Sequence, residues 1–308
     1  SSIKHFKNIN LSIEKAMKKL QDEYMQVSRP FYEGPAGQHV GYEKLEQALN
    51  FVNEKKFVIA AGCTDLLAAT ENRSLSGNIL DITKISCLNG FYLDKNYRRI
   101  GATTTWSEIV NSNLPECYEM LKACGKEIGS IQIQNSGTIG GNLCNASPAA
   151  DSVPCLLALD ADVELSSIDK KRIIPLSKFI TGSRKINLKT NELLTSILIP
   201  IEKEKGISAF LKIGARKYLV ISITMAACRM EIKDKIIKSI SISIGSCSEV
   251  AKRITSIESL LIGKHIENYD LEKIDFKKMT ELTPISDIRS DKKYREKATK
   301  VLIKQIVK

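Results

Sequence analysis

The chain has 308 residues, of which 43% are hydrophobic and 26% are charged, and this excludes a disordered polymer and is typical of a globular protein. No apolar run is long enough to span a membrane, and the N-terminus lacks the basic-then-apolar order of a signal peptide, so we expect a cytoplasmic protein. The net charge of +11 comes from dispersed lysines without aromatic-basic motifs, which predicts solvated helix faces, or steering of anionic partners, and no nucleic-acid partner.

Residues 1–40 are expected to form an N-terminal extension. Apolar residues at helical spacing predict an amphipathic helix from Leu11 to Met25, and the Pro/Gly-rich stretch from Arg29 to Gly37 is typical of a linker. This segment would dock a partner subunit or cover an edge of the chain's own fold.

Residues 41–203 are expected to form a domain with two lobes, at about 41–90 and 91–203. In the first lobe, a helix, a strand, a second helix and a strand predict a small βαβ-like unit. The expected helices are Gly41–Glu54, Trp106–Asn111, Cys117–Gly129 (extending to Ile131 at most) and Ser152–Leu159. The expected strands are Phe57–Ala61, Asn78–Ile82, Tyr97–Thr104, Ala161–Ser166, Lys171–Pro175 and Leu193–Ile199.

Residues 206–308 are expected to form a third unit, with an antiparallel sheet followed by helices, so the fold class is α+β. The strict alternation of Ile240-Ser-Ile-Ser-Ile predicts a half-buried strand. The expected strands are Ile207–Ile213, Ile221–Ile232 and Ile236–Ile244. The expected helices are Ile254–Leu261, Leu271–Glu281 and Asp291–Ile306.

The stretch from Thr138 to Asp151, Thr-Ile-Gly-Gly-Asn-Leu-Cys-Asn-Ala-Ser-Pro-Ala-Ala-Asp, is the most informative of the chain. Adjacent glycines allow backbone N–H groups to approach a ligand, and consecutive N–H groups in a turn suit a diphosphate. Hydroxyl and amide side chains add donors, and Asp151 adds an acceptor suited to sugar-like hydroxyls. The alternative is a structural turn with a helix cap.

A second candidate turn follows the apolar run from Phe57 to Ala61, which is typical of a buried strand. The strand ends at Gly62-Cys63-Thr64-Asp65, and a helix is expected next. A tight turn with a hydroxyl and a carboxylate at its tip is a second phosphate cradle, or simply a helix N-cap. Two cradles in one domain suit a dinucleotide better than a single phosphate.

These two turns resemble the flavin-binding signatures of the FAD (medium) subunits of molybdenum hydroxylases, the family of xanthine, carbon monoxide and nicotinate dehydrogenases. Three further stretches resemble the same family in the same order, and together they cover residues 41–308. The five stretches are Ala61–Asp65, Thr138–Asn142, Asn191–Pro200, Phe210–Arg216, and Pro284-Ile-Ser-Asp-Ile-Arg-Ser with Tyr294-Arg295.

The resemblance implies a two-lobed PCMH-type FAD-binding domain followed by a smaller C-terminal domain. It implies that the FAD diphosphate is held by Ala61, Gly62, Cys63, Thr64, Asp65, Thr138, Ile139, Gly140, Gly141 and Asn142. It implies that Ser147 and Asp151 contact the ribityl region, and that Leu193 and Leu194 pack on the flavin or adenine. Phe210 and Lys212 would lie near the isoalloxazine, where a cation stabilises the negative charge of reduced flavin.

Three residues depart from the family pattern. Cys63 stands where the first loop usually has a second glycine, so a positive φ there would be strained. Cys63 is either a redox thiol or, more commonly, an inert buried cysteine. Gln134 replaces a frequent arginine near the diphosphate, and Phe210 replaces a tyrosine found in some relatives.

No metal or catalytic acid–base group is expected in this chain. Disulfides are not expected in a cytosolic chain of this size. The cysteines form no C-x-x-C pair, and their wide spacing argues against an iron–sulfur cluster. The three histidines, His5, His39 and His265, lie outside the motifs. The cysteines are Cys63, Cys87, Cys117, Cys124, Cys144, Cys155, Cys228 and Cys247.

The resemblance implies an oxidoreductase subunit that works in a multi-subunit complex. A small partner subunit would hold two two-iron two-sulfur clusters, a large partner would hold molybdopterin, and electrons would pass through FAD to NAD or another acceptor. One alternative is a stand-alone flavin reductase of the enolpyruvyl-glucosamine reductase type. The other is a scaffold subunit that binds no flavin.

Overall fold

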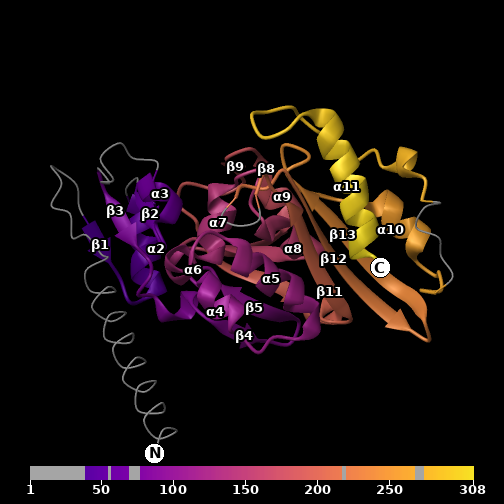
Figure 1. The fold of residues 1–308 in the computed structure, drawn as a ribbon. Coiled ribbons are helices and arrows are strands. Elements are labelled where there is room, and N and C mark those ends of the chain that lie inside the picture. Colours follow the sequence, from indigo (N-terminus) through magenta and orange to yellow (C-terminus); the bar gives the residue numbers. More distant parts are fainter. Residues whose placement is uncertain (1–38, 55–56, 69–76, 217–219, 268–273) are drawn as a thin grey trace, which may run out of the picture.

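The structure is a computed structural model that describes residues 39–54, 57–68, 77–216, 220–267 and 274–308. The predicted helix from Leu11 to Met25 and the linker from Arg29 to Gly37 lie outside these residues. Three units follow one another along the chain: an N-terminal lobe, a central lobe and a C-terminal sheet covered by helices (Figure 1). Within the described residues, no helix combines the length and apolarity needed to cross a membrane.

The first lobe is a three-stranded parallel sheet with strand order β1-β3-β2. Its core forms where apolar residues of α2, such as Ala48 and Val52, pack on Leu80 of the central strand and on Ile85. The βαβ-like prediction is confirmed, but the first helix begins four residues later than predicted because Gly41 belongs to β1. The elements are β1 (His39–Gly41), α2 (Leu45–Glu54), β2 (Val58–Ala60), α3 (Thr64–Ala68), β3 (Ile79–Asp81) and a 3-10 turn (Ser86–Leu88).

The second lobe is a five-stranded antiparallel sheet with strand order β4-β5-β10-β6-β7. Its middle strand β10 is an almost continuous apolar run buried on both faces, as expected for a central strand. Helices α4, α5, α7, α8 and α9 contribute residues to the largest core, which includes Trp106. The strands are β4 (Phe91–Leu93), β5 (Tyr97–Gly101), β6 (Asp162–Ser166), β7 (Lys171–Pro175), β8 (Ile180–Gly182), β9 (Lys185–Ile186) and β10 (Leu193–Pro200). The helices are α4 (Trp106–Val110), α5 (Glu119–Glu127), α6 (Ile131–Ser136), α7 (Ile139–Asn145), α8 (Ser152–Ala158) and α9 (Leu176–Phe179), with 3-10 turns at Glu116–Tyr118 and Ile201–Lys203.

The predicted helix from Cys117 to Gly129 is confirmed as α5 (Glu119–Glu127), which begins and ends two residues inside the predicted bounds. A 3-10 turn precedes α5, and Gly129 then takes a left-handed conformation with φ of +59°. A Cβ at Gly129 would stand 2.8 Å from the side chain of Ile133, so this sharp turn into α6 requires glycine.

The C-terminal unit is a four-stranded antiparallel sheet with strand order β11-β12-β13-β14. Alternation along β12 sends Ala227 into the core of the second lobe, whereas Ala226 and Cys228 face the helices α10 and α11. Figure 1 shows α11 lying along the outer side of this sheet. The elements are β11 (Ile207–Ile213), β12 (Thr224–Lys233), β13 (Ile236–Gly245), β14 (Lys252–Arg253), α10 (Thr255–Leu261), a 3-10 turn (Phe276–Lys278) and α11 (Lys292–Ile306).

Two predictions in this unit need correction. The alternating strand is buried on both faces, because Ser241 is only 2% exposed on the side facing the second lobe and accepts a hydrogen bond from Arg229. The predicted helix Leu271–Glu281 is not found in its described part. There the chain forms only a 3-10 turn, capped by the Asp275 side chain, which accepts from the Lys277 N–H at 3.1 Å.

Candidate functional site

The first candidate loop connects β2 to α3 and packs tightly against the second lobe. A Cβ on Gly62 would stand 2.7 Å from the carbonyl carbon of Ser136 and 2.8 Å from Cα of Gly137, so only glycine allows this approach. The loop therefore meets the segment that leads into the glycine pair. The structure brings together two motifs that are far apart in the sequence.

Cys63 has a φ of +55°, in the left-handed region. A non-glycine residue is strained there, as expected for a cysteine that replaces the usual glycine of the family. Its side chain is partly buried, and burial, followed by the charge of Asp81, raises the pKa of the thiol. A raised pKa leaves less thiolate at neutral pH, which favours the inert interpretation over a redox-active thiol.

Replacing Cys63 with glycine is expected to raise the free energy of unfolding by up to about 1 kcal/mol, because relief of the left-handed strain exceeds the entropy that glycine adds to the unfolded chain. Chemical denaturation of the purified chain measures this. Lys235→Gly is a matched control, because Lys235 also has a positive φ, of +60°, in the hairpin between β12 and β13. A destabilised Cys63→Gly beside a stabilised Lys235→Gly would show that burial of the thiol outweighs the strain.

The glycine pair forms the first turn of α7 rather than an open turn. Thr138 is the N-cap of this helix, and its hydroxyl accepts from the Gly141 N–H at 3.1 Å. The N–H groups of Ile139 and Gly140 donate to the carbonyls of Thr104 and Ala102 at 3.0 and 2.9 Å. The expectation that these N–H groups are free to bind phosphate is therefore wrong, because the protein already uses them.

The two glycines differ in their surroundings. Gly140 is buried, and a Cβ there would stand 2.6 Å from the Ala102 carbonyl oxygen. Gly141 is exposed, and a Cβ there would meet only the Thr138 hydroxyl, at 2.8 Å. Gly140 is thus required for packing of α7 on the sheet, whereas Gly141 leaves an open surface where a ligand could approach the backbone.

Side-chain hydrogen bonds fix the relative positions of the two loops. Asn145, at the end of α7, donates from Nδ2 to Oδ2 of Asp65 at 2.7 Å, and also pairs with Arg184. Ser152, in the first turn of α8, donates to Oδ1 of Asn142 at 2.6 Å. The loop after β2, helix α7 and the start of α8 therefore form one connected polar surface.

Asp151 and Lys212 form a buried ion pair at the end of this surface. Nζ of Lys212 lies 2.9 Å from Oδ2 of Asp151, and both side chains are 8% exposed. Ser222 donates to the other carboxylate oxygen at 2.6 Å. Burial raises the pKa of Asp151, against the opposing effects of Lys212 and Ser222.

Four other predicted residues lie around these loops. Leu193 and Leu194 are buried in the cores of the first and second lobes, respectively, so β10 passes through the junction of the lobes. Phe210 on β11 packs partly on the second-lobe core. Ser147 lies between α7 and α8, where its hydroxyl accepts from the Ala149 N–H at 3.3 Å.

Comparison with known proteins places this chain in a family. Residues 39–202 match the model of the FAD binding domain in molybdopterin dehydrogenase, and residues 209–308 match that of the CO dehydrogenase flavoprotein C-terminal domain. The first match alone covers more than half of the chain. The chain belongs to the FAD-binding subunits of the molybdenum hydroxylases. The recognition from sequence is thereby confirmed, and with it FAD as the cofactor of an oxidoreductase subunit.

Individual relatives agree with this assignment. The chain is 29% identical to the glyceraldehyde dehydrogenase medium chain of Sulfolobus acidocaldarius, over 87% of this chain and 96% of the relative. It is 31% identical to the nicotinate dehydrogenase FAD-subunit of Eubacterium barkeri, over 71% of this chain and 77% of the relative. In fold it is similar to carbon monoxide dehydrogenase from Hydrogenophaga pseudoflava, with a TM-score of 0.79 and 22% identity over 90% of this chain and 97% of that one.

The residues of the flavin subunit fit a diphosphate at the loop after β2. The N–H groups of Thr64, Asp65 and Leu66 lie in the first turn of α3, where a helix offers no acceptor of its own. No acceptor for them is found in the part of the chain that the structure describes. Unpaired N–H groups in a turn that Asp65 joins to Asn145 of α7 are a suitable donor set for an anion.

Sequence reasoning missed several residues of this surface. Asn145 could have been found from the sequence, because it lies one helical turn after the predicted site residue Asn142 and so on the same face of the helix. The partners of Gly62 and Asp151, namely Ser136 and Ser222, are distant in sequence and carried no such signal. Among the described residues, no group of three His, Cys, Asp or Glu side chains is placed to hold a metal ion. All eight cysteines are free thiols.

Proposed function

We propose that FAD binds across the junction of the two lobes, with its diphosphate at the loop Ala61–Asp65 and beside Gly141 and Asn142. Three observations support this proposal: the unpaired N–H groups of α3, the open backbone at Gly141, and the packing of Gly62 on Ser136 and Gly137. The observation that carries most weight is the packing of Gly62, because it places the first loop against the segment that leads into the glycine pair.

The Asp151–Lys212 pair is proposed to lie at the flavin end of the cofactor. Asp151 follows directly on the surface defined by Asn142 and Ser152, so a ligand that extends from Gly141 along α7 would reach it. A carboxylate has about four lone-pair sites. With two hydrogen bonds accepted inside the protein, Asp151 retains acceptor capacity for ribityl hydroxyls, as the resemblance implies.

The chain is proposed to carry electrons between other components of a complex. FAD supplies two-electron chemistry when bound, and the protein supplies binding, orientation and electrostatics. We propose that an iron–sulfur small subunit delivers the electrons, that a molybdopterin large subunit oxidises the organic substrate, and that NAD or another carrier accepts the electrons. The cationic surface of a chain with a net charge of +11 suits anionic partners, including NAD.

A visible absorption spectrum of the purified chain, with chromatography of the released cofactor, tests the flavin assignment. One FAD per chain is expected, and co-purification of an iron–sulfur and a molybdopterin subunit is expected from the native host. A colourless chain that also refuses added FAD would support the scaffold alternative. Turnover of a substrate by the isolated chain would support the stand-alone reductase.

Replacing Lys212 with methionine is expected to change the FAD reduction potential more than the FAD content, because the cation faces the charge of the reduced ring. It should also lower stability by about 3 kcal/mol, since it leaves the Asp151 carboxylate buried without its counter-charge. Loss of Lys212 raises the folded-state pKa of Asp151 further. A carboxyl group with a raised pKa in the folded state destabilises the fold when it ionises. The loss of stability caused by Lys212→Met should therefore be larger at about pH 8 than at about pH 5.

Redox titration and denaturation at both pH values measure these effects. The double variant Lys212→Met, Asp151→Asn is the control, because an uncharged amide needs no counter-charge and should recover much of the lost stability. An unchanged potential in Lys212→Met would remove the proposed role of this lysine.

A further inference from the structure

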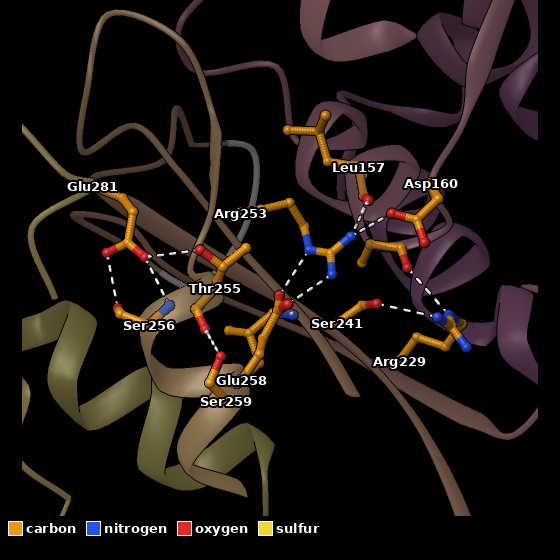
Figure 2. A network of polar contacts seen from close by, with 12 residues as sticks. Leu157, Asp160, Arg229, Ser241, Arg253, Thr255, Ser256, Glu258, Ser259 and Glu281 are labelled. Carbon is orange, nitrogen blue, oxygen red and sulfur yellow. Dashed lines mark hydrogen bonds and ion pairs between the residues drawn. The ribbon is translucent and has the colours of Figure 1, made fainter. Parts of the chain in front are cut away.

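Helix α8 is held at both ends by the C-terminal unit. At its N-terminal end, Lys212 and Ser222 bind the carboxylate of Asp151. At its C-terminal end, two arginines of the C-terminal unit bind the last carbonyls of the helix (Figure 2). The first end adjoins the proposed flavin surface, and the second does not.

The network at the C-terminal end of α8 lies away from the proposed flavin surface and serves only to hold the helix. Arg229 donates from Nε to the Ala158 carbonyl at 3.1 Å, and Arg253 donates to that of Leu157 at 3.3 Å. Glu258 fixes Arg253 through two hydrogen bonds of 2.7 Å and accepts the Ile242 N–H at 2.7 Å, as the sticks of Figure 2 illustrate for Arg253. The Arg229 bond supplies a donor to the Ala158 carbonyl at the end of the helix, and the Arg253 bond adds a second donor to the Leu157 carbonyl, which also accepts from the Asp160 N–H at 3.0 Å.

The N-terminal end has a second layer behind Ser222. Arg289 donates from Nη1 to the Ser222 carbonyl at 3.2 Å, and Arg295 donates to the carbonyls of Ile223 and Ser246. Arg295 is fully buried. Two arginines therefore hold two consecutive carbonyls, at the position where Ser222 reaches Asp151.

Asp287 joins these two arginines. One carboxylate oxygen accepts from Nε and Nη2 of Arg289 at 3.1 and 2.6 Å, and the other accepts from Nη2 of Arg295 at 2.6 Å. Burial opposes its charge, but the hydrogen bonds from Arg289 and the charges of both arginines hold the pKa of Asp287 below its ordinary value. The carboxylate is therefore ionised at neutral pH and keeps both arginines oriented.

We propose that Asp287 is a positioning residue for the redox site, acting through the two arginines and Ser222 to set the charge balance of the Asp151–Lys212 pair. This inference rests on the proposed function, because it needs FAD beside that pair. It assigns a role to the C-terminal Pro284-Ile-Ser-Asp-Ile-Arg stretch, which forms no direct hydrogen bond with the candidate flavin loops among the described residues.

The direction of the effect follows from electrostatics. The Ser222 hydrogen bond stabilises the ionised form of Asp151, which neutralises Lys212. Without that bond the Asp151 carboxylate protonates more readily, so the positive charge of Lys212 is less neutralised and acts more strongly on the flavin ring. A reduced flavin gains negative charge, and the reduction potential should therefore shift to a more positive value.

The experiment is a redox titration of FAD in the complete FAD-loaded protein. Asp287→Asn and Ser222→Ala are each expected to shift the midpoint potential to a more positive value, and the double variant should show no further shift beyond Ser222→Ala. Glu258→Gln is the matched control: it also removes the charge of a carboxylate that binds an arginine in two hydrogen bonds, but at the other end of α8. It should lower stability without a shift in potential.

Three results would overturn the proposal: a shift in Ser222→Ala but none in Asp287→Asn, additive shifts in the double variant, or no shift in either single variant. If Asp287→Asn fails to fold, Arg289→Gln replaces it, because it removes the donor to the Ser222 carbonyl and leaves Asp287 paired with Arg295. Failure of the proposed function itself would look different, since the wild-type protein would then hold no FAD to titrate.

Discussion

A Gly141→Val variant is expected to purify as a folded protein that retains less than about one tenth of the normal FAD, because a branched side chain would stand where the backbone is open to the ligand. The fold should tolerate it. The new Cβ meets only the Thr138 hydroxyl, at 2.8 Å, and loss of that helix cap costs about 1 kcal/mol. The flavin-to-protein absorbance ratio measures retention, and circular dichroism checks the fold.

Gly140→Ala provides the contrast. Its Cβ would stand 2.6 Å from the Ala102 carbonyl oxygen and 2.7 Å from the Ala102 side chain, so it should destabilise the second lobe itself. Side chains added at these neighbouring positions would thus distinguish a glycine needed for packing from a glycine needed for ligand binding. A normal FAD content in Gly141→Val would contradict the proposed cradle.

A Gly62→Ala variant is expected to lose both stability and FAD. Its Cβ would collide with the main chain of Ser136 and Gly137, which cannot move as a flexible side chain could, so a cost of about 3 kcal/mol is expected. Displacement of the loop would also break the hydrogen bond of Asp65 with Asn145. Denaturation and cofactor release, followed together, measure both effects.

Gly77→Ala is a suitable control, because a Cβ there meets nothing within 4 Å although the backbone φ is +84°. It therefore carries conformational strain without a collision at the lobe junction. If Gly62→Ala bound FAD normally and unfolded like the wild type, the contact between the two loops would have no role in binding.

Local patterns in the sequence predicted the elements well wherever the signal was itself local. The strands Lys171–Pro175 and Ile207–Ile213 have the predicted bounds, and the two lobes and the C-terminal antiparallel sheet are as expected. The short helix α6 (Ile131–Ser136) was missed, because it buries none of its residues and so has no apolar face for a sequence pattern to show.

The sequence predicted which loops form the candidate site, but it did not predict the hydrogen bonds that these loops make. Sequence reasoning assigned the N–H groups of the glycine pair to phosphate, whereas Ala102, Thr104 and Thr138 accept from the first turn of that helix. It assigned Asp151 to the ribityl region of the cofactor, and did not predict that the carboxylate binds Lys212 and Ser222. These partners come from distant strands, and no local pattern encodes such pairings.

The distribution of apolar cores has a consequence for how the cofactor enters and leaves. The strand β12 contributes side chains to two cores at once, so the second lobe and the C-terminal sheet should unfold as one cooperative unit. The first lobe has a smaller core of its own, shared with the rest mainly through Leu193. We therefore expect the first lobe to open at the lowest free energy. If FAD binds across the two lobes as proposed, it would stabilise the closed arrangement by mass action.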